Sequence, residues 1–248
     1  MHRFYIPPAS WKTEPLQLDA AEAHHALDVL RFKIGDRVAI FNGEGTEATV
    51  EIYAIGRNSV DVRILQQSKS HPLACRITLA QAIPKGKNMD LIVQKATELG
   101  AAEIVPLLSE RTVVQVDGGD SAKKQQKWQA VAIEAAKQCG QNWLPSVTKP
   151  QTPKEFFHAN PRYDLLLIAS LQPDARHLKQ LLKETREVTG KSVESVLVLI
   201  GPEGDFTPAE ISLAKGYGCQ PITLGPIVLR TETAAIYSLS VLGYELLS

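Results

Sequence analysis

The hydrophobic pattern of the first 70 residues is mainly that of β-strands. Apolar and polar positions alternate over residues 37–41 and again over 46–55. The turn pair Asn42-Gly43 separates these runs, so we expect a β-hairpin. A further strand is expected over residues 60–65.

One helix interrupts these strands. Asp19 and Glu22 have the spacing of a capping box, in which the first side chain accepts from a first-turn amide and the second reaches back. We therefore expect a helix from this point to about Leu30. The polar run 66–72 ends in a proline, and it is the predicted domain boundary.

Beyond residue 73 the pattern changes to strands that alternate with helices. This order is typical of a largely parallel sheet covered by helices on both faces, so the predicted fold class is α/β. The expected strands cover residues 76–82, 103–108, 164–169, 196–200 and 222–224, and the expected helices cover 88–99, 122–139, 175–187, 208–217 and 233–247.

The last of these helices is apolar around most of its circumference. A helix of this kind must be buried on more than one side. In a domain of this size, a second subunit could cover the second side, and neighbouring helices of the same chain are the alternative. We favour a homodimer.

Composition excludes several classes of protein. With 248 residues, 44% of them hydrophobic, the chain can bury a core, but it has no apolar run of about 20 residues that could span a membrane. The first residues lack the apolar stretch of a signal peptide, so we expect a cytoplasmic protein. Three cysteines without a Cys-x-x-Cys pair, and six scattered histidines, predict neither disulfides nor a metal site.

The charge is balanced, with 27 basic and 27 acidic residues. Residues 73–150 are mildly basic, and Lys123, Lys124 and Lys127 lie near the start of one expected helix. Such a run is more often a solvated helix face than a contact with RNA. If the chain binds RNA, a local surface must supply the phosphate contacts, since there is no general basic field.

Two Gly-Pro loops follow apolar strands of the predicted sheet. In open α/β sheets, ligands bind beyond the carboxyl ends of the strands. The first loop, 201–206, leads into Thr207-Pro208-Ala209-Glu210, a capping box with proline at the first helical position. Alone, this loop could be a simple strand-to-helix turn.

The second loop, 224–234, repeats this arrangement and adds two opposite charges among apolar neighbours, Arg230 and Glu232. Charges near a core must be paired or used. The two loops together therefore predict a ligand site.

Two apparent nucleotide motifs are rejected. Residues 43–48 have the glycine spacing of a dinucleotide loop, but such a loop must lead into a helix, whereas a strand is expected here. The lysines around Pro84 lack the spacing of a P-loop.

Motifs spread over nearly the whole chain resemble the RsmE-type branch of the SPOUT methyltransferases. They are His25–Arg31 with Gly35-Asp36, Lys85–Asp90, Gln94–Gly100, Ser109–Arg111, Glu134–Ala136, Gln138–Gly140, Ile200–Phe206 and Leu229–Ala234.

The resemblance implies an enzyme that uses S-adenosylmethionine to methylate N3 of a uridine in 16S ribosomal RNA, uridine 1498 in the standard numbering of that RNA. It also implies an N-terminal PUA-like β-barrel domain that helps to hold RNA, over residues 1–72. The C-terminal SPOUT α/β domain, residues 73–248, would contain a deep trefoil knot and the surface of a homodimer. The RNA would be bound within the small ribosomal subunit, and no membrane or metal is implied.

The resemblance also implies site residues. The residues expected to bind the cofactor are Leu171, Ile200, Gly201, Pro202, Glu203, Gly204, Leu224, Gly225, Leu229, Thr231, Thr233 and Ala234. The residues expected to contact RNA are Arg3, Arg31, Lys33, Lys85 and Lys95. Two positions depart from the family pattern: Asp205 stands where glycine is expected, and Gln141 where arginine is expected.

Methylation of uridine N3 requires loss of a proton, because this nitrogen is protonated at neutral pH. A positioned carboxylate typically contributes about 10²- to 10⁴-fold to such a step. We expect Glu203 or Glu232 to take or orient the proton. Arg230 or Arg111 would stabilise the uracil anion, and the alternative is an Arg230–Glu232 ion pair that only shapes the loop. The His24-His25 pair is expected to pack or cap rather than bind a ligand.

Two other functions stay open from the residues alone. The first is another SPOUT activity, such as methylation of the ribose 2′-oxygen. The second is a non-catalytic RNA-binding assembly factor, which the unusual Asp205 favours.

Overall fold

The computed structural model describes residues 1–12, 14–112, 118–190 and 192–247. The chain divides into two compact units. Unit 1 comprises Met1–Pro72 together with Ile133–Leu144, and unit 2 comprises Leu73–Ala132 and Pro145–Ser248.

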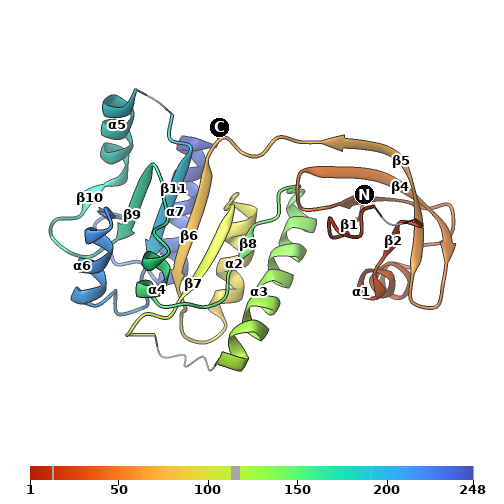
Figure 1. Cartoon of the computed structure of the whole chain (residues 1–248), viewed down its shortest axis with the longest axis horizontal. Helices are drawn as coiled ribbons and strands as arrows, with labels where there is room; N and C mark the ends of the chain where they lie inside the picture. The colour runs from red at the N-terminus through yellow and green to blue at the C-terminus, as the bar shows by residue number, and fades with distance from the viewer. Residues whose placement is uncertain (13, 113–117, 191, 248) are drawn as a thin grey trace. The chain divides into compact units, whose positions relative to one another are not determined.

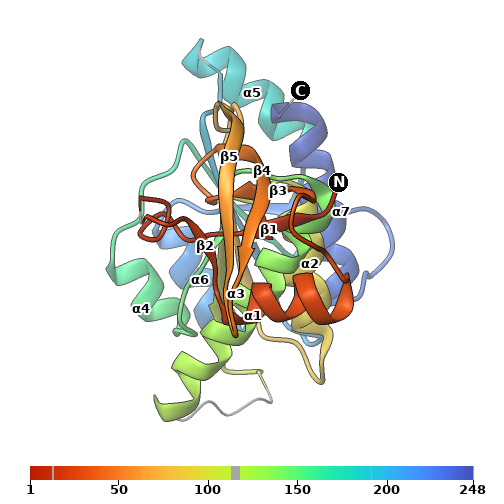
Figure 2. The same cartoon turned by 90° about the vertical axis from the view of Figure 1, so that its right-hand side faces the viewer.

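Unit 1 is built on a five-stranded sheet with the strand order β1-β3-β4-β5-β2. Its strands are β1 (Arg3–Tyr5), β2 (Gln17–Leu18), β3 (Arg37–Phe41), β4 (Thr46–Ile55) and β5 (Val60–Lys69). The predicted hairpin is confirmed, because β3 and β4 pair antiparallel around residues 42–45. Figure 2 shows β4 and β5 as two long neighbouring strands of this sheet. The strand expected to end at residue 65 continues to Lys69, into the polar run.

One helical segment packs on this sheet. It consists of α1 (Ala20–His24) and a π-helical turn, η1 (His25–Val29). Asp19 caps it as predicted, because its Oδ1 accepts from the Glu22 N–H at 2.9 Å. The prediction of the second capping-box bond is wrong. The Glu22 carboxylate accepts instead from Nζ of Lys137, at 3.0 and 3.1 Å. A distant cation therefore takes the place of the local bond.

Unit 2 contains a seven-stranded sheet with the order β10-β12-β9-β11-β6-β7-β8, in which every strand pair is parallel. The predicted parallel sheet is confirmed. Its strands are β6 (Arg76–Ala82), β7 (Glu103–Leu107), β8 (Ser146–Val147), β9 (Leu165–Ala169), β10 (Arg176–His177), β11 (Ser195–Ile200) and β12 (Gln220–Thr223).

Helices cover both faces of this sheet, as predicted. They are α2 (Asn88–Glu98), α4 (Pro153–His158), α5 (Leu178–Thr189), α6 (Pro208–Gly216) and α7 (Thr231–Leu246). Phe156 and Phe157 of α4 and Ile211 of α6 pack on one face against Leu197 and Leu199 of β11. On the other face α7 packs against β6, β11 and α2. In Figure 1, α6 lies in front of the sheet and α7 behind it.

The longest helix, α3 (Gly118–Cys139), contributes to both units, because the unit boundary along the chain falls at Ile133. The predicted start of α5 at residue 175 is wrong. Residues 176 and 177 form strand β10, which pairs with Ile222 and Thr223 of β12. Strands β1, β2 and β8 and helix α4 were not predicted. The trefoil knot stays a prediction of the resemblance.

Candidate functional site

A pocket lies at the carboxyl ends of three neighbouring strands of unit 2, β9, β11 and β12. In the sheet, β9 stands between β11 and β12, so the loops that follow the three strands converge. The pocket encloses about 600 Å³, including the open space at its mouth.

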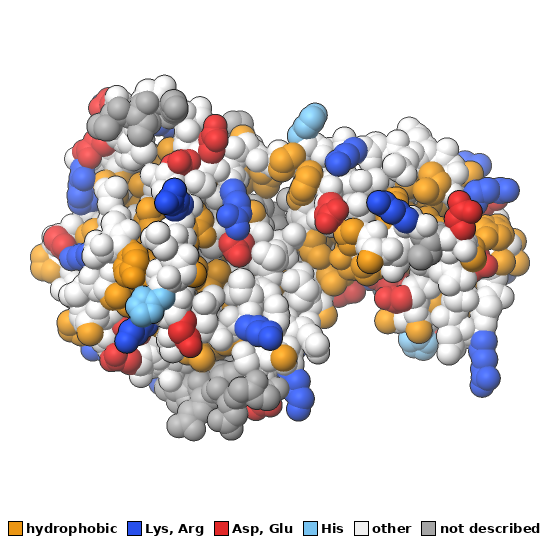
Figure 3. All heavy atoms as spheres, in the orientation of Figure 1, with side chains coloured by type: hydrophobic (Ala, Val, Ile, Leu, Met, Phe, Trp, Pro, Cys, Tyr) orange, Lys and Arg blue, Asp and Glu red, His pale blue; other side chains and the backbone are white. Residues whose placement is uncertain are grey.

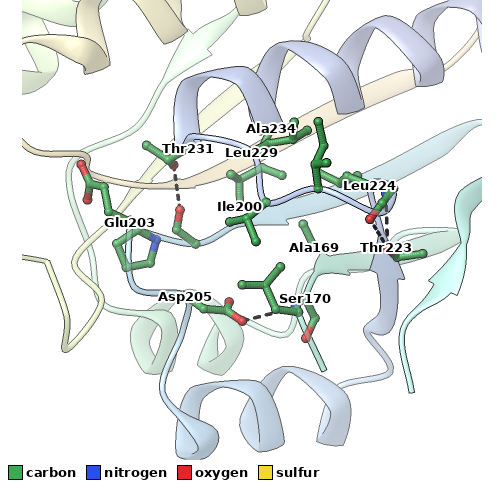
Figure 4. Close-up of a pocket in the computed structure, with 16 residues that line it drawn as sticks. Ala169, Ser170, Ile200, Glu203, Asp205, Thr223, Leu224, Leu229, Thr231 and Ala234 are labelled. Carbon is green, nitrogen blue, oxygen red and sulfur yellow. Dashed lines mark hydrogen bonds between the residues drawn. The ribbon is translucent and has the colours of Figure 1, made fainter. Parts of the chain in front are cut away.

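Both Gly-Pro loops contribute to this pocket, as Figure 4 shows. Ten of the twelve residues expected to bind a cofactor line it: Leu171, Ile200, Gly201, Pro202, Glu203, Leu224, Gly225, Leu229, Thr231 and Ala234. Gly204 and Thr233 are not among its lining residues.

Six lining residues were not among those expected to bind the cofactor, although Asp205, Ile227 and Val228 lie within the two predicted Gly-Pro loops. They are Ala169, Ser170, Asp205, Thr223, Ile227 and Val228. A signal for two of them was present, since Ala169 ends β9 and Ser170 follows it at the same edge of the sheet as Gly201 after β11. The rule that ligands bind beyond the carboxyl ends of strands therefore applied to three loops rather than two.

The loop after β11 is held by contacts from several elements. The backbone N–H of Lys85, which follows β6, donates to Oε1 of Glu203 at 2.9 Å. The guanidinium of Arg111, which follows β7, donates to the carbonyl oxygen of Gly204. Thr231, at the start of α7, donates from Oγ1 to the carbonyl oxygen of Gly201 at 2.7 Å. The first Gly-Pro loop is thus fixed on several sides.

The helix that follows this loop begins with the predicted capping box. Thr207 Oγ1 accepts from the Glu210 N–H at 3.3 Å, and Glu210 Oε2 accepts from the Thr207 N–H at 2.9 Å. Glu210 is buried and also accepts from Ser109 Oγ and the Glu110 N–H, both at 3.0 Å. The carboxylate therefore joins α6 to the loop after β7.

Asp205 occupies the position where glycine was expected. Its φ is +60°, in the left-handed region that favours glycine and that Asn and Asp tolerate better than most residues. Its Oδ1 accepts from the Phe206 N–H at 2.7 Å, and its Oδ2 accepts from the Leu171 N–H at 3.4 Å (Figure 4). The carboxylate thus stabilises this conformation and joins the loops after β9 and β11.

The chemistry of the lining suits a ligand with an apolar part and a positive charge. Two carboxylates line the pocket, Glu203 and Asp205, and no Lys or Arg is among its described lining residues. Leu171, Ile227 and Val228 also line it and are 64%, 70% and 74% exposed. Large apolar side chains left open beside a pocket could cover an aromatic base. S-adenosylmethionine has an adenine and a sulfonium cation, so the residues fit this cofactor.

The four residues expected to act in catalysis have different surroundings. Glu203 and Arg111 are bonded to the backbone of neighbouring loops. Arg230 is the N-cap residue of α7 and is exposed, and Glu232 is half-buried in the first turn of this helix. Within the described chain, neither Arg230 nor Glu232 forms an ion pair, so the alternative of an Arg230–Glu232 pair is not realised.

The residues expected to contact RNA also differ in their freedom. Arg3 has a side chain only 10% exposed, and it binds Glu47 Oε2 at 2.9 Å, the Ala136 carbonyl oxygen at 2.8 Å and Asn142 Oδ1. These contacts tie residues 133–144 to the sheet of unit 1. Lys95 forms an ion pair with Glu98 at 2.7 Å.

Three other basic residues expected to contact RNA, Arg31, Lys33 and Lys85, have exposed side chains. Lys127, from the basic run of α3, forms an ion pair with Asp90 at 2.6 Å. Gln141, the second departure from the family pattern, accepts from the Trp143 N–H at 3.2 Å and so shapes a turn in unit 1. His24 binds Asp28 at 2.6 Å, and His25 packs edge-on against Phe4.

The described residues offer no metal-binding cluster and no membrane-spanning helix. Nowhere in this part of the chain do three or more His, Cys, Asp or Glu side chains gather in a way that could hold a metal ion. No helix of the described ranges is long and apolar enough to cross a bilayer.

Comparison with known proteins identifies both parts of the chain. Residues 71–243 match the model of an RNA methyltransferase domain, and residues 18–65 match that of an RNA methyltransferase PUA domain. The chain is 31% identical to ribosomal RNA small subunit methyltransferase E of Synechocystis, over 96% of this chain and 76% of the relative.

Two solved structures superpose on nearly the whole chain. One is a Legionella pneumophila protein described as a methyltransferase, in complex with the cofactor S-adenosylmethionine, with 35% identity, a TM-score of 0.87 and coverage of 99% of this chain and 98% of the other. The second is ribosomal RNA small subunit methyltransferase E of Neisseria gonorrhoeae bound to S-adenosylmethionine, with 29% identity, a TM-score of 0.84 and the same coverage. From the match of its RNA methyltransferase and PUA domains and its full-length similarity to these proteins, the chain belongs to the RNA methyltransferase family that includes the ribosomal RNA small subunit methyltransferases E.

Proposed function

We propose that this protein methylates N3 of a uridine in 16S ribosomal RNA with S-adenosylmethionine as the methyl donor. The observation that carries this proposal is the pocket between the loops after β9, β11 and β12, which has an acidic and apolar lining. Relatives that are similar over most of this chain are named as methyltransferases of small-subunit ribosomal RNA, and two similar structures contain S-adenosylmethionine. Because the reaction acts on the ribosome, we place the protein in the cytoplasm.

The cofactor would be held by backbone groups and apolar side chains of the three loops. Leu171, Ile227 and Val228 would cover its base, and the carboxylate of Asp205 would favour its positive charge. When bound, S-adenosylmethionine supplies an electrophilic methyl group on a sulfonium centre. The residues of the chain must then align this group with the uracil ring, and orientation of this kind is worth up to about 7–11 kcal/mol.

We assign the proton transfer to Glu232. Glu203 is already bonded to the backbone of Lys85, and in Figure 4 its carboxylate points away from the centre of the pocket. Glu232 directly follows the lining residue Thr231 and is half-exposed. Its carboxylate accepts no hydrogen bond from another described side chain, so it is free to accept a proton.

Arg230 is assigned to the uracil oxygens for a similar reason. The guanidinium of Arg111 holds the Gly204 carbonyl oxygen, whereas that of Arg230 is exposed at the N-terminus of α7. A cation next to the positive end of a helix dipole does not stabilise the helix. A catalytic role explains its position better, because a cation beside the uracil oxygens stabilises the anion that forms when N3 loses its proton.

We further propose that unit 1 helps to hold the RNA. Arg31 and Lys33 are exposed beside the exposed apolar residues Val29 and Ile34. On the face of unit 1 that Figure 3 shows, Lys and Arg side chains stand among hydrophobic ones rather than in one basic field. Together with Lys85 and Lys95 of unit 2, such local contacts would bind phosphates. Arg3 is left out of this set because its side chain is only 10% exposed and both terminal nitrogens of its guanidinium are bonded within unit 1.

A homodimer is also proposed. One side of α7 packs in unit 2, but Tyr237 and Tyr244, seven residues apart on one side of the helix, are exposed. A second copy of the chain would cover this side. The mass in solution, measured by light scattering, tests this proposal: a dimer that Tyr237→Glu converts to monomer supports it, and a monomeric wild-type protein contradicts it.

The methylation itself is tested on small ribosomal subunits from cells that lack this protein. Incubation with the purified protein and S-adenosylmethionine should yield 3-methyluridine in the 16S RNA, detected by mass spectrometry of nucleosides. A ribose-methylated nucleoside instead would mean a different acceptor atom. A protein that binds RNA but neither binds S-adenosylmethionine nor transfers methyl groups would be an assembly factor.

A further inference from the structure

A buried amide lies directly behind the pocket. Gln81 is next to last in β6, and its side chain is fully buried. Its Nε2 donates to the carbonyl oxygen of Ala82 at 2.8 Å and to Oγ1 of Thr231 at 3.0 Å. Gln81 thus connects the end of a central strand to the first residue of α7.

The direction of each hydrogen bond between Gln81, Thr231 and Gly201 is fixed. A carbonyl oxygen can only accept, so the group of Gln81 that faces Ala82 must be the NH₂. Thr231 Oγ1 therefore accepts from this NH₂, and its own proton is left for the Gly201 carbonyl oxygen, 2.7 Å away. The series of hydrogen bonds therefore runs in one direction, from Gln81 through Thr231 to Gly201.

Both ends of the Thr231–Gly201 bond belong to the pocket wall. Gly201 comes from the first Gly-Pro loop, and Thr231 lies in the second, where α7 begins. The walls of the pocket are therefore joined by a hydroxyl whose orientation depends on Gln81.

The amide is not explained by local stability. Gln81 Oε1 is buried and has no hydrogen-bond partner among the described residues. A buried acceptor without a partner destabilises the folded state, so an apolar side chain of similar size would suit this position better if packing were its only role.

We infer that Gln81 is a positioning residue for S-adenosylmethionine: it orients the Thr231 hydroxyl toward Gly201 and so holds the two Gly-Pro loops at the separation that the cofactor requires. This inference rests on the proposed function. It predicts that loss of the amide weakens cofactor binding although the side chain is covered by the pocket wall.

Four variants and one control test this inference in the full-length protein. Gln81→Met keeps the volume and removes both donors, and Thr231→Val removes the hydroxyl. The double variant tests whether the two act together, and Thr231→Ser restores the hydroxyl. Thr78→Val, a buried polar residue near the opposite end of β6, is the matched control. Calorimetry with S-adenosylmethionine gives the affinity, and hydrogen–deuterium exchange without ligand reports on the backbone of residues 200–206.

We expect Gln81→Met and Thr231→Val each to weaken binding by about tenfold, the scale of one oriented hydrogen bond. The affinity of the double variant should fall by no more than about the same factor, because the two residues belong to one series of hydrogen bonds. Exchange at residues 200–206 should become faster in Gln81→Met, and Thr78→Val should behave as wild type. Thr231→Ser should bind the cofactor more tightly than Thr231→Val, because it retains the hydroxyl.

Wild-type affinity and exchange in Gln81→Met would overturn the inference, and so would losses that multiply in the double variant. If Gln81→Met does not fold, the comparison of Thr231→Val with Thr231→Ser decides, and equal affinity of these two overturns it. A wild-type protein that does not bind S-adenosylmethionine would refute the proposed function instead, which separates the two failures.

Discussion

The backbone N–H of Lys85 donates a 2.9 Å hydrogen bond to the carboxylate of Glu203, and it thereby joins the loop after β6 to the first Gly-Pro loop. A carboxylate in this position is needed as an acceptor, not as a charge. The amide oxygen of glutamine can accept the same bond.

Glu203→Gln should therefore keep most of the methylation activity, whereas Glu203→Ala should weaken binding of S-adenosylmethionine by about tenfold, since one acceptor for a backbone N–H is lost. Steady-state kinetics and calorimetry on both variants check this. A Glu203→Gln variant that binds the cofactor and RNA normally but does not turn over would make Glu203 the base and remove Glu232 from that role.

Replacement of Arg230 should lower the rate of methylation without lowering the stability of the protein. Arg230→Ala should lower kcat by about a hundredfold, the usual loss when one group that stabilises an anion is removed. Its melting temperature should not fall, because a cation beside a helix N-terminus contributes no favourable dipole interaction. Thermal melting and single-turnover methylation measure both. Lys215→Ala, on α6 and paired with Asp174, serves as a control for loss of a surface cation.

The left-handed backbone of Asp205 allows a three-way comparison. Asp205→Ala should destabilise the protein by about 1–2 kcal/mol, because alanine is strained at this φ. Asp205→Gly should be closer to wild type in stability, because glycine adopts this conformation freely. Both variants lose the bond to the Leu171 N–H and should bind the cofactor more weakly. Urea unfolding and calorimetry separate the two effects, and equal stability of the two variants would contradict the assignment of strain.

In unit 1 the largest effect is expected at the pair of Glu22 and Lys137. Their side chains are only 11% and 8% exposed, with an N–O distance of 3.0 Å. Lys137→Met should cost about 3–5 kcal/mol, because it leaves a carboxylate in the interior without its cation. Adding Glu22→Gln should restore part of this loss. Denaturant unfolding of the three proteins checks the coupling, and additive losses would show that the pair does not act as a unit.

The cysteines give a prediction that depends on pH. Burial, together with the nearby Asp164 and Glu194, raises the pKa of the Cys75 thiol to about 11. Burial raises that of Cys219 to about 12. At pH 8 both stay protonated, and thiols react as thiolates. Only the exposed Cys139 should therefore be alkylated in the native protein, whereas all three should react in urea. Mass spectrometry of the modified peptides measures this.

Local patterns predicted most of the secondary structure of the chain. Strand β6 and the hairpin strands β3 and β4 match their predicted residues, because each has an alternating or continuous apolar run bounded by turn residues. The start of α5 was wrong, since β10 forms by pairing with β12, which no pattern around residue 176 reveals. The capping bond of Glu22 failed for the same reason: a residue 115 positions away competes for the carboxylate.

In the site, too, local patterns predicted some features, and contacts between distant residues decided the others. The two Gly-Pro loops were found because glycine, proline and apolar strands leave a local signature. The loop after β9 has no such residues, and only its place after a predicted strand, together with Leu171 from the resemblance, pointed to it. Arg3 was expected to contact RNA, yet its guanidinium binds Ala136, 133 residues away along the chain. Long-range partners of this kind decide whether a basic side chain is free, and charge counting does not reveal them.

The second segment of unit 1 affects how this protein could be recombined with its relatives. Residues 133–144 supply Lys137 for Glu22 and the Ala136 carbonyl oxygen for Arg3, so a gene fragment that stops at Pro72 encodes a sheet without these partners. A chimera that exchanges unit 1 by a single crossover would combine the first segment of one parent with the second segment of the other. Modular exchange in this family therefore requires two crossovers that move both segments together, or compensating changes at these contacts.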